Sequence, residues 1–150
     1  MVLTRRPVTL ADFDATLAIK KEALGQYIAQ VWGWDDEIQR QYHQSHYHPG
    51  NIVLLLCDGQ SAGFLETADI PDSLSIINLL LLPKFQSRGI GTQVLKQLLQ
   101  QAATAGQVVY LEVLKVNIRA YNLYHRLGFV IRDTSELKVR MVYSPYHEVR

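Results

Sequence analysis

The 150-residue chain has a single cysteine, Cys57, so it cannot form an internal disulfide, which fits a reducing compartment. It also lacks an excess of charge of either sign, because 15 basic and 14 acidic residues leave a formal net charge of +1. This charge gives no reason to expect a nucleic acid or a membrane as a partner. The most apolar segment, residues 76–82, is interrupted by Asn78 and is far too short to span a bilayer. The N-terminus lacks the apolar run of a signal peptide. These absences predict a cytoplasmic protein.

What is present is the composition of an ordinary folded chain. Hydrophobic residues make up 48% of the sequence and charged residues 19%. The length fits one domain, residues 1–150, with a core of its own, and the sequence shows no repeat, low-complexity segment or linker. We therefore expect a single domain.

Turn residues and hydrophobic periodicity predict the order of the elements in the first half of the chain. A short strand near residues 2–6 comes first. A helical segment follows, capped by Thr9 with Asp12 three residues later, and a second helix begins near Asp35. Three apolar strands are then expected, at residues 52–57, 62–68 and 74–82, with Asp58-Gly59 as a hairpin turn.

The second half predicts two more helices and three more strands. Apolar spacing indicates a helix over residues 91–105 and a strand over residues 108–113. Asn117 can cap the next helix, and strands near residues 129–132 and 137–143 finish the chain. This order predicts an α+β fold, a mixed α/β sandwich. Its mixed, mostly antiparallel sheet has six to seven strands, flanked by about four helices.

The segment PKFQSRGIG, residues 83–91, joins a strand to a helix through two glycines, a place where backbone N–H groups can hold an anion. A P-loop is excluded, because no lysine follows the second glycine and the glycine spacing is wrong. The dinucleotide fingerprint lacks its third glycine, and the roughly sixty residues that follow are too few for that fold. A pyrophosphate site at the helix start remains, as does the alternative of a turn that binds nothing.

Two segments resemble the GNAT family of N-acetyltransferases. Gln86, Gly89 and Gly91 match the family motif Q/R-x-x-G-x-G/A. The downstream signature L-x-V-x-x-x-N-x-x-A-x-x-L-Y-x-x-x-G-F is matched in register by Leu111, Val113, Asn117, Ala120, Leu123, Tyr124, Gly128 and Phe129. The resemblance covers about residues 53–142. It implies the GNAT-type fold, in which strands 4 and 5 splay apart.

The resemblance implies acetyl-CoA as cosubstrate and no metal ion. Main-chain groups of the glycine turn would hold its pyrophosphate, with cationic help from Lys84 and Arg88, and the end of strand 74–82 would pair with its pantetheine arm. The cofactor-binding residues so implied are Leu80, Leu81, Leu82, Gln86, Ser87, Arg88, Gly89, Ile90, Gly91, Thr92, Asn117 and Tyr124.

The resemblance also implies direct attack of a primary amine on the thioester in a ternary complex. Tyr124 would give a proton to the departing thiolate, whereas its pattern alone equally suits a core tyrosine. Glu112 resembles the base of the ribosomal-protein N-terminal acetyltransferases, at the same offset from the tyrosine, and Glu66 is its rival. The glutamate of histone-type members aligns with Ser75 and is absent. Either glutamate can instead simply face solvent.

The first fifty residues, which choose the acceptor in this family, carry no comparable fingerprint. Aromatic residues there can line an acceptor site or simply pack two helices; they are Tyr27, Trp32, Trp34 and His46. The histidines at 43, 46 and 48 lack further ligands, so no metal site is expected. The acceptor is a small-molecule or peptide amine, and a homodimer is left open. A non-catalytic acyl-CoA sensor of the same fold is the competing class.

Overall fold

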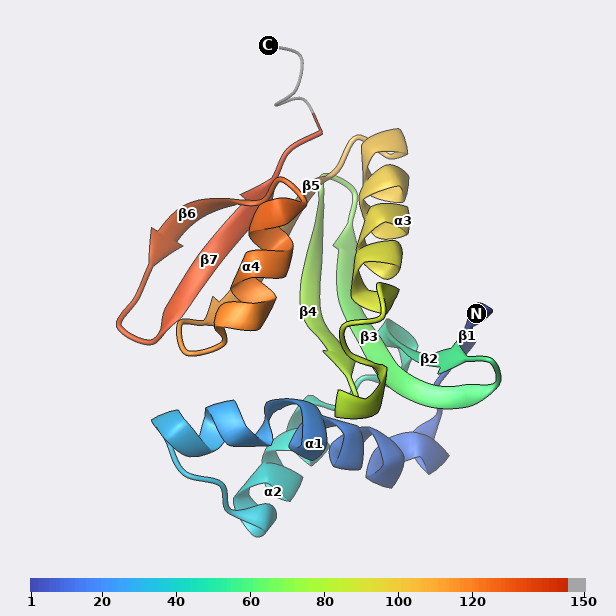
Figure 1. The fold of residues 1–150 in the computed structure, drawn as a ribbon, viewed down its shortest axis with the longest axis vertical. Coiled ribbons are helices and arrows are strands. Elements are labelled where there is room, and N and C mark those ends of the chain that lie inside the picture. Colours follow the sequence, from blue (N-terminus) through green and yellow to red (C-terminus); the bar gives the residue numbers. More distant parts are fainter. Residues whose placement is uncertain (146–150) are drawn as a thin grey trace. The chain divides into compact units, whose positions relative to one another are not determined.

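The computed structural model describes residues 1–145 (Figure 1). Its strands and α-helices are β1 (Leu3–Pro7), α1 (Phe13–Val31), α2 (Asp36–His46), β2 (Ile52–Cys57), β3 (Gln60–Ile70), β4 (Ser73–Leu81), α3 (Ile90–Thr104), β5 (Val108–Leu114), α4 (Ile118–Arg126), β6 (Val130–Thr134) and β7 (Lys138–Tyr143). Short 3-10 helices are η1 (Leu10–Asp12), η2 (Pro49–Asn51) and η3 (Pro83–Phe85). Among the helices of residues 1–145, none is both long and apolar enough to cross a membrane.

The described strands form one seven-stranded sheet in the order β1-β2-β3-β4-β5-β7-β6. β4 runs parallel to β5, whereas β1 with β2, β2 with β3, β5 with β7 and β6 with β7 are antiparallel. The ladder between β4 and β5 joins only Ser73–Ile76 to Val108–Leu111, although both strands continue beyond it. The predicted α+β class, with its mixed sheet and splayed central strands, is confirmed.

Helix caps and turns form where local sequence signals place them. Thr9 and Asp12 make the predicted capping box at η1, and the Asp35 side chain caps α2 by accepting a hydrogen bond from the Ile38 N–H. Asp58 and Gly59 have φ angles of 50° and 81°, the left-handed pair that a two-residue hairpin turn needs. This tight turn lets β3 begin at residue 60, two residues earlier than predicted.

The contacts group the chain into two compact units: Met1–Glu66 with Asn78–Arg88, and Thr67–Ile77 with the chain from Gly89 onward. The core of the first unit consists of Val8, Ile19, Ala23, Ile52, Leu54, Phe64 and Leu80. In this unit α2 lies alongside α1 (Figure 1), joined by the Lys21–Asp36 and Arg40–Asp14 ion pairs, at 2.7 and 2.9 Å. That the two units form one domain stays a prediction.

The second unit is organised by α3, α4 and strands β5, β6 and β7. The buried face of α3 is Ile90, Gly91, Val94, Leu95, Leu98, Leu99 and Ala102, close to the predicted apolar stripe. After α4, the ring of Phe129 lies 5.6 Å from that of Tyr143 on β7, with α4 beside β7 in Figure 1. Gly128 has a φ of 100° and its Cα faces the Tyr143 ring, so the chain turns sharply between α4 and β6.

Candidate active site

The turn into α3 leaves the first backbone N–H groups of that helix without a side-chain cap. Its N-cap is Gly89, in the left-handed region with φ of 79°, and it has no side chain to accept a hydrogen bond. A Cβ at Gly89 would meet nothing within 4 Å, so the backbone torsion, not space, is what requires glycine here. Uncapped N–H groups at the positive end of a 15-residue helix are suited to binding an anion.

Cationic and amide side chains surround this turn. Lys84 and Arg88 lie 5.4 and 5.3 Å from the ring centroid of Phe85, which is buried, so one aromatic ring holds both charges beside the turn. The Gln86 amide donates a 2.9 Å hydrogen bond to the Leu81 carbonyl and ties the turn to the end of β4. Gln86, the first residue of the predicted pyrophosphate motif, therefore has a structural role of its own. The two cations Lys84 and Arg88 flank the turn.

The end of β4 is shaped by a glycine that the sequence analysis did not single out. A Cβ at Gly63 on β3 would lie 1.9 Å from the Leu80 carbonyl oxygen, closer than any side chain allows. The Leu82 N–H donates a 2.8 Å hydrogen bond to the Ala62 carbonyl in the same region. The main-chain path of Leu80–Leu82 thus depends on glycine at position 63. The sequence did carry a signal for this, since an isolated glycine inside a strand often marks the close approach of another backbone.

Asn117 and Tyr124 both lie on or next to α4. Asn117 is buried and caps α4, because its Oδ1 accepts a 3.1 Å hydrogen bond from the Ala120 N–H. Among the described residues, its Nδ2 donates no hydrogen bond. Tyr124 is only 7% exposed, with its ring edge-on to Phe129 at 5.7 Å, and burial raises its pKa to about 12. A phenol in this setting stays protonated at neutral pH and keeps its O–H donor.

Glu112 lies on the exposed face of β5. It pairs across the ladder with Arg140 on β7, and its carboxylate is 3.2 Å from Lys138 Nζ. Its neighbours along β5, Leu111 and Val113, are buried on the opposite face of the sheet. Tyr143 lies on that same face and contacts Gly128, the residue that follows α4 in the chain by two positions. Within the second unit, Glu112 and α4 therefore lie on opposite faces of the sheet, and the Glu112 carboxylate is open to solvent.

Glu66, the rival base, has a different environment. It is 8% exposed at the end of its ladder with β2, and its Oε1 accepts a 2.9 Å hydrogen bond from the Asn78 side chain on β4. Lys20 on α1, equally buried, interacts electrostatically with the Glu66 carboxylate. Sequence reasoning gave no site role to Lys20 or Asn78, because the contacts of both with Glu66 depend on tertiary packing.

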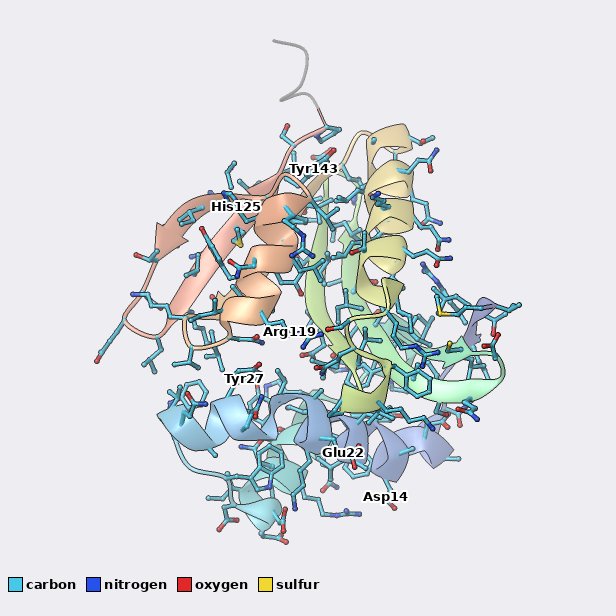
Figure 2. All side chains as sticks on the ribbon, viewed as in Figure 1. Asp14, Glu22, Tyr27, Arg119, His125 and Tyr143 are labelled. Atoms are coloured by element: carbon cyan, nitrogen blue, oxygen red, sulfur yellow. The ribbon has the colours of Figure 1, made fainter. Side chains whose placement is uncertain are left out.

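The aromatic residues expected at an acceptor site are spread over α1, α2 and their connection. Tyr27 is half-buried on α1 (Figure 2), Trp32 is exposed just after it, and the Trp34 indole donates a 2.7 Å hydrogen bond to Asp36. On α2 the His46 ring stacks on Tyr42 at 4.1 Å. That these residues line an acceptor site stays a prediction.

His43 has a structural role. It is buried, and its Nε2 lies 2.9 Å from the Thr16 hydroxyl on α1. Burial, with further help from Lys20 and Arg40, lowers its pKa to about 4, so the ring is neutral at pH 7. Within residues 1–145, no group of three His, Cys, Asp or Glu side chains is arranged to hold a metal ion.

Residues 17–129 match the model of the acetyltransferase (GNAT) family. The chain belongs to this family. It is 35% identical over 92 residues to a ribosomal protein bS18-alanine N-acetyltransferase of Salmonella typhimurium, covering 61% of this chain and 59% of that protein. It is 30% identical over 120 residues to the enzyme of that name from Haemophilus influenzae, covering 73% and 78%. The match thus spans under two thirds of the Salmonella relative.

Solved structures agree with this membership at the level of the fold. One similar structure is the PaiA N-acetyltransferase of Thermoplasma acidophilum in complex with coenzyme A, with a TM-score of 0.78 and 18% identity. The alignment covers 96% of this chain and 99% of that one. The resemblance expected from the two sequence motifs is therefore confirmed for family and fold.

Proposed function

We propose that the chain is an acetyl-CoA-dependent N-acetyltransferase that transfers the acetyl group to a primary amine by direct attack in a ternary complex. The observation that carries this proposal is the uncapped N-terminus of α3 at Gly89, with Lys84 and Arg88 held beside it. The coenzyme A complex of the Thermoplasma relative supports the choice of ligand. The single cysteine fits a cytoplasmic location.

The donor is bound mainly by main-chain groups. The N–H groups of residues 88–92 hold the diphosphate of coenzyme A, since they are free of side-chain caps and carry the positive end of the helix dipole. The main chain of Leu80–Leu82, whose path Gly63 permits, hydrogen-bonds the pantetheine amides as an added strand does. Asn117 contributes its Nδ2 donors to the same arm while its Oδ1 caps α4.

Tyr124 is the proton donor to the leaving group. When the amine nitrogen bonds to the thioester carbon, the C–S bond breaks and its electron pair goes to sulfur, forming a thiolate of ordinary pKa near ~8.5. The Tyr124 phenol, held protonated by burial, donates its hydrogen to that sulfur. Burial thus keeps the acid in the form that the reaction needs.

Glu112 is the proton acceptor for an amine that reaches the thioester from the face of β5 opposite to α4 and Tyr124. An amine nucleophile must lose a proton, because a lysine-type amine titrates near ~10.4 and an α-amine near ~8. The Glu112 side chain is 48% exposed, so it is open to an acceptor arriving from solvent, and Lys138 Nζ contacts its Oε1. The two bS18-alanine relatives favour an α-amino group of a protein as the first acceptor to test. Small amines are the alternative.

Thermal shift with coenzyme A and acetyl-CoA, followed by thiol release on a panel of amines, tests this function. The account expects stabilisation by both ligands and thiol release with at least one amine. Stabilisation without thiol release on any amine favours the non-catalytic sensor. Absence of stabilisation contradicts both functions.

A further inference from the structure

Tyr124, the proposed general acid, is held by packing and by no polar partner. Within residues 1–145 its hydroxyl makes no hydrogen bond. Its side chain is 7% exposed, and its ring meets that of Phe129 edge-on, with 5.7 Å between the centroids. A general acid acts only where its proton is within reach of the departing atom, and a displacement of about 1 Å can lower the rate about a hundredfold. The side chains that hold the Tyr124 ring in place therefore affect the rate of the proposed reaction.

The C-terminal end of α4 ties the main chain of Phe129 to that of Tyr124. The Tyr124 carbonyl accepts a 3.1 Å hydrogen bond from the Phe129 N–H. The His125 carbonyl accepts a second one, also of 3.1 Å, from the Gly128 N–H. With Gly128 at a φ of 100°, these bonds form a Schellman motif, in which the residue after the glycine packs against the last turn of the helix. The contact between the Tyr124 and Phe129 rings is therefore part of the way in which α4 ends.

Tyr143, at the end of β7 (Figure 2), packs against this turn. Its ring centroid is 5.6 Å from that of Phe129, which is only 1% exposed. A Cβ at Gly128 would lie 3.2 Å from the same ring, so Tyr143 also lies directly against the backbone of the turn. In the sheet, Tyr143 pairs with the buried Val109 of β5. The rings of Tyr124, Phe129 and Tyr143 thus form a continuous row from the active-site side chain to β7.

The ring of Tyr143, and not its hydroxyl, makes these contacts. Among the described residues the Tyr143 hydroxyl has no hydrogen-bond partner, and the side chain is half-buried. Phenylalanine at this position keeps the contacts with Phe129 and Gly128, whereas leucine removes the ring that makes them. Two substitutions at one position therefore separate the effect of the ring from that of the hydroxyl.

We propose that Tyr143 is a positioning residue for Tyr124, acting through Phe129 and the turn at Gly128. This inference rests on the proposed acetyltransferase function, because it gives Tyr143 a part in the same proton transfer. Without the Tyr143 ring, Phe129 has room to move. Tyr124 moves with it, because the two residues are joined through both their rings and their main chains. The departing thiolate then meets a displaced proton donor.

Two single variants give the first test. Tyr143→Leu should lower kcat about tenfold and leave the KM for acetyl-CoA within about twofold of the wild-type value, because the displaced donor matters only when the C–S bond breaks. Tyr143→Phe keeps the ring and should have wild-type kcat and KM. Circular dichroism checks that each variant is folded, and Tyr143→Met takes the place of Tyr143→Leu if the latter is not.

A double-mutant cycle distinguishes positioning from a general structural effect. Tyr124→Phe is expected to retain about a hundredth of the wild-type turnover, enough to measure. In that background Tyr143→Leu should cause no further fall in kcat, because no proton remains to be positioned. A substitution that merely lowers the fraction of folded protein would lower kcat by the same factor in both backgrounds.

Other outcomes overturn the proposal. An unaltered kcat in Tyr143→Leu, an equal loss in Tyr143→Phe, a change confined to KM, or the same loss in both backgrounds would each do so. If wild-type protein turns over no amine, the proposed function fails by itself. Nuclear magnetic resonance of protein labelled with ¹³C in its tyrosine rings then decides the positioning role. The Tyr124 ring should flip about tenfold faster in Tyr143→Leu than in wild type and Tyr143→Phe, and an unaltered flip rate refutes the role.

Discussion

At the scale of single residues, Tyr124 is the most informative side chain for the chemistry. Burial holds it as a neutral phenol, and removal of the hydroxyl leaves the packing against Phe129 intact. Tyr124→Phe should therefore lower kcat by about a hundredfold, the range of one general acid, with coenzyme A affinity nearly unchanged. Thiol release and calorimetric titration measure the two quantities. Wild-type turnover in this variant would remove the assignment.

Kinetic measurements on two glutamine variants distinguish the roles of Glu112 and Glu66. Glu112→Gln should lower kcat, because the proton of the amine then has no acceptor on the protein. Glu66→Gln should leave kcat nearly unchanged, since in this account it changes only the hydrogen bond with the Asn78 side chain. The opposite pattern, with kcat lowered only by Glu66→Gln, would transfer the role of base to Glu66.

The buried Lys20 side chain should lower the free energy of unfolding. Its pKa is lowered in the folded state, so the unfolded chain holds the proton more tightly, and the penalty is full at pH values below the folded pKa. Lys20→Met should raise the free energy of unfolding by on the order of 1 kcal/mol at pH 7. This gain should shrink as the pH rises through 10.5, where both states lose the proton. Urea titrations at the two pH values check this, and a destabilised variant would contradict it.

His43 on α2, whose ring contacts α1, should make the stability of the protein depend on pH. Its pKa is about 4 in the folded protein against 6.5 for a free histidine, so the unfolded chain binds a proton between those values and the folded chain does not. Stability contributed by neutral His43 is present above pH 6.5 and is lost as the pH falls toward 4. His43→Gln should lose less stability over this range than wild type. His48→Gln, at an exposed histidine, should behave like wild type.

At the scale of elements, the approach of β3 to β4 is the most demanding contact. Gly63→Ala would place a methyl group against the Leu80 carbonyl, and backbone must move to accommodate it. We expect a loss of about 1–3 kcal/mol in the free energy of unfolding, as for other overpacked sites. Gly25→Ala on α1 is the control, because its nearest contact would be an ordinary 3.7 Å and alanine favours a helix. Equal stability of the two variants would contradict this account.

Elements were largely predictable because their signals are local. Thr9, Asp35 and Asn117 cap helices through hydrogen bonds to residues two or three positions away, which a sequence displays directly. Gly63 was missed because its constraint comes from a strand partner seventeen positions later. Lys20 was missed for a related reason: only the packing of α1 against distant strands shows that this lysine is buried.

At the scale of the whole molecule, the motifs predicted the family, and the seven-stranded order agrees with the α+β fold that they imply. The residues proposed to hold the diphosphate are contiguous in the sequence, so a short motif reports them. The first fifty residues carry no comparable motif for the acceptor. This difference explains why the donor could be predicted from the sequence while the acceptor could not.

The most direct test of the account is a crystal structure of this protein with coenzyme A. The account predicts diphosphate oxygens within hydrogen-bond distance of the main-chain nitrogens of residues 88–92, at the start of α3. A coenzyme whose diphosphate lies elsewhere, with the turn at Gly89 unoccupied, would contradict it.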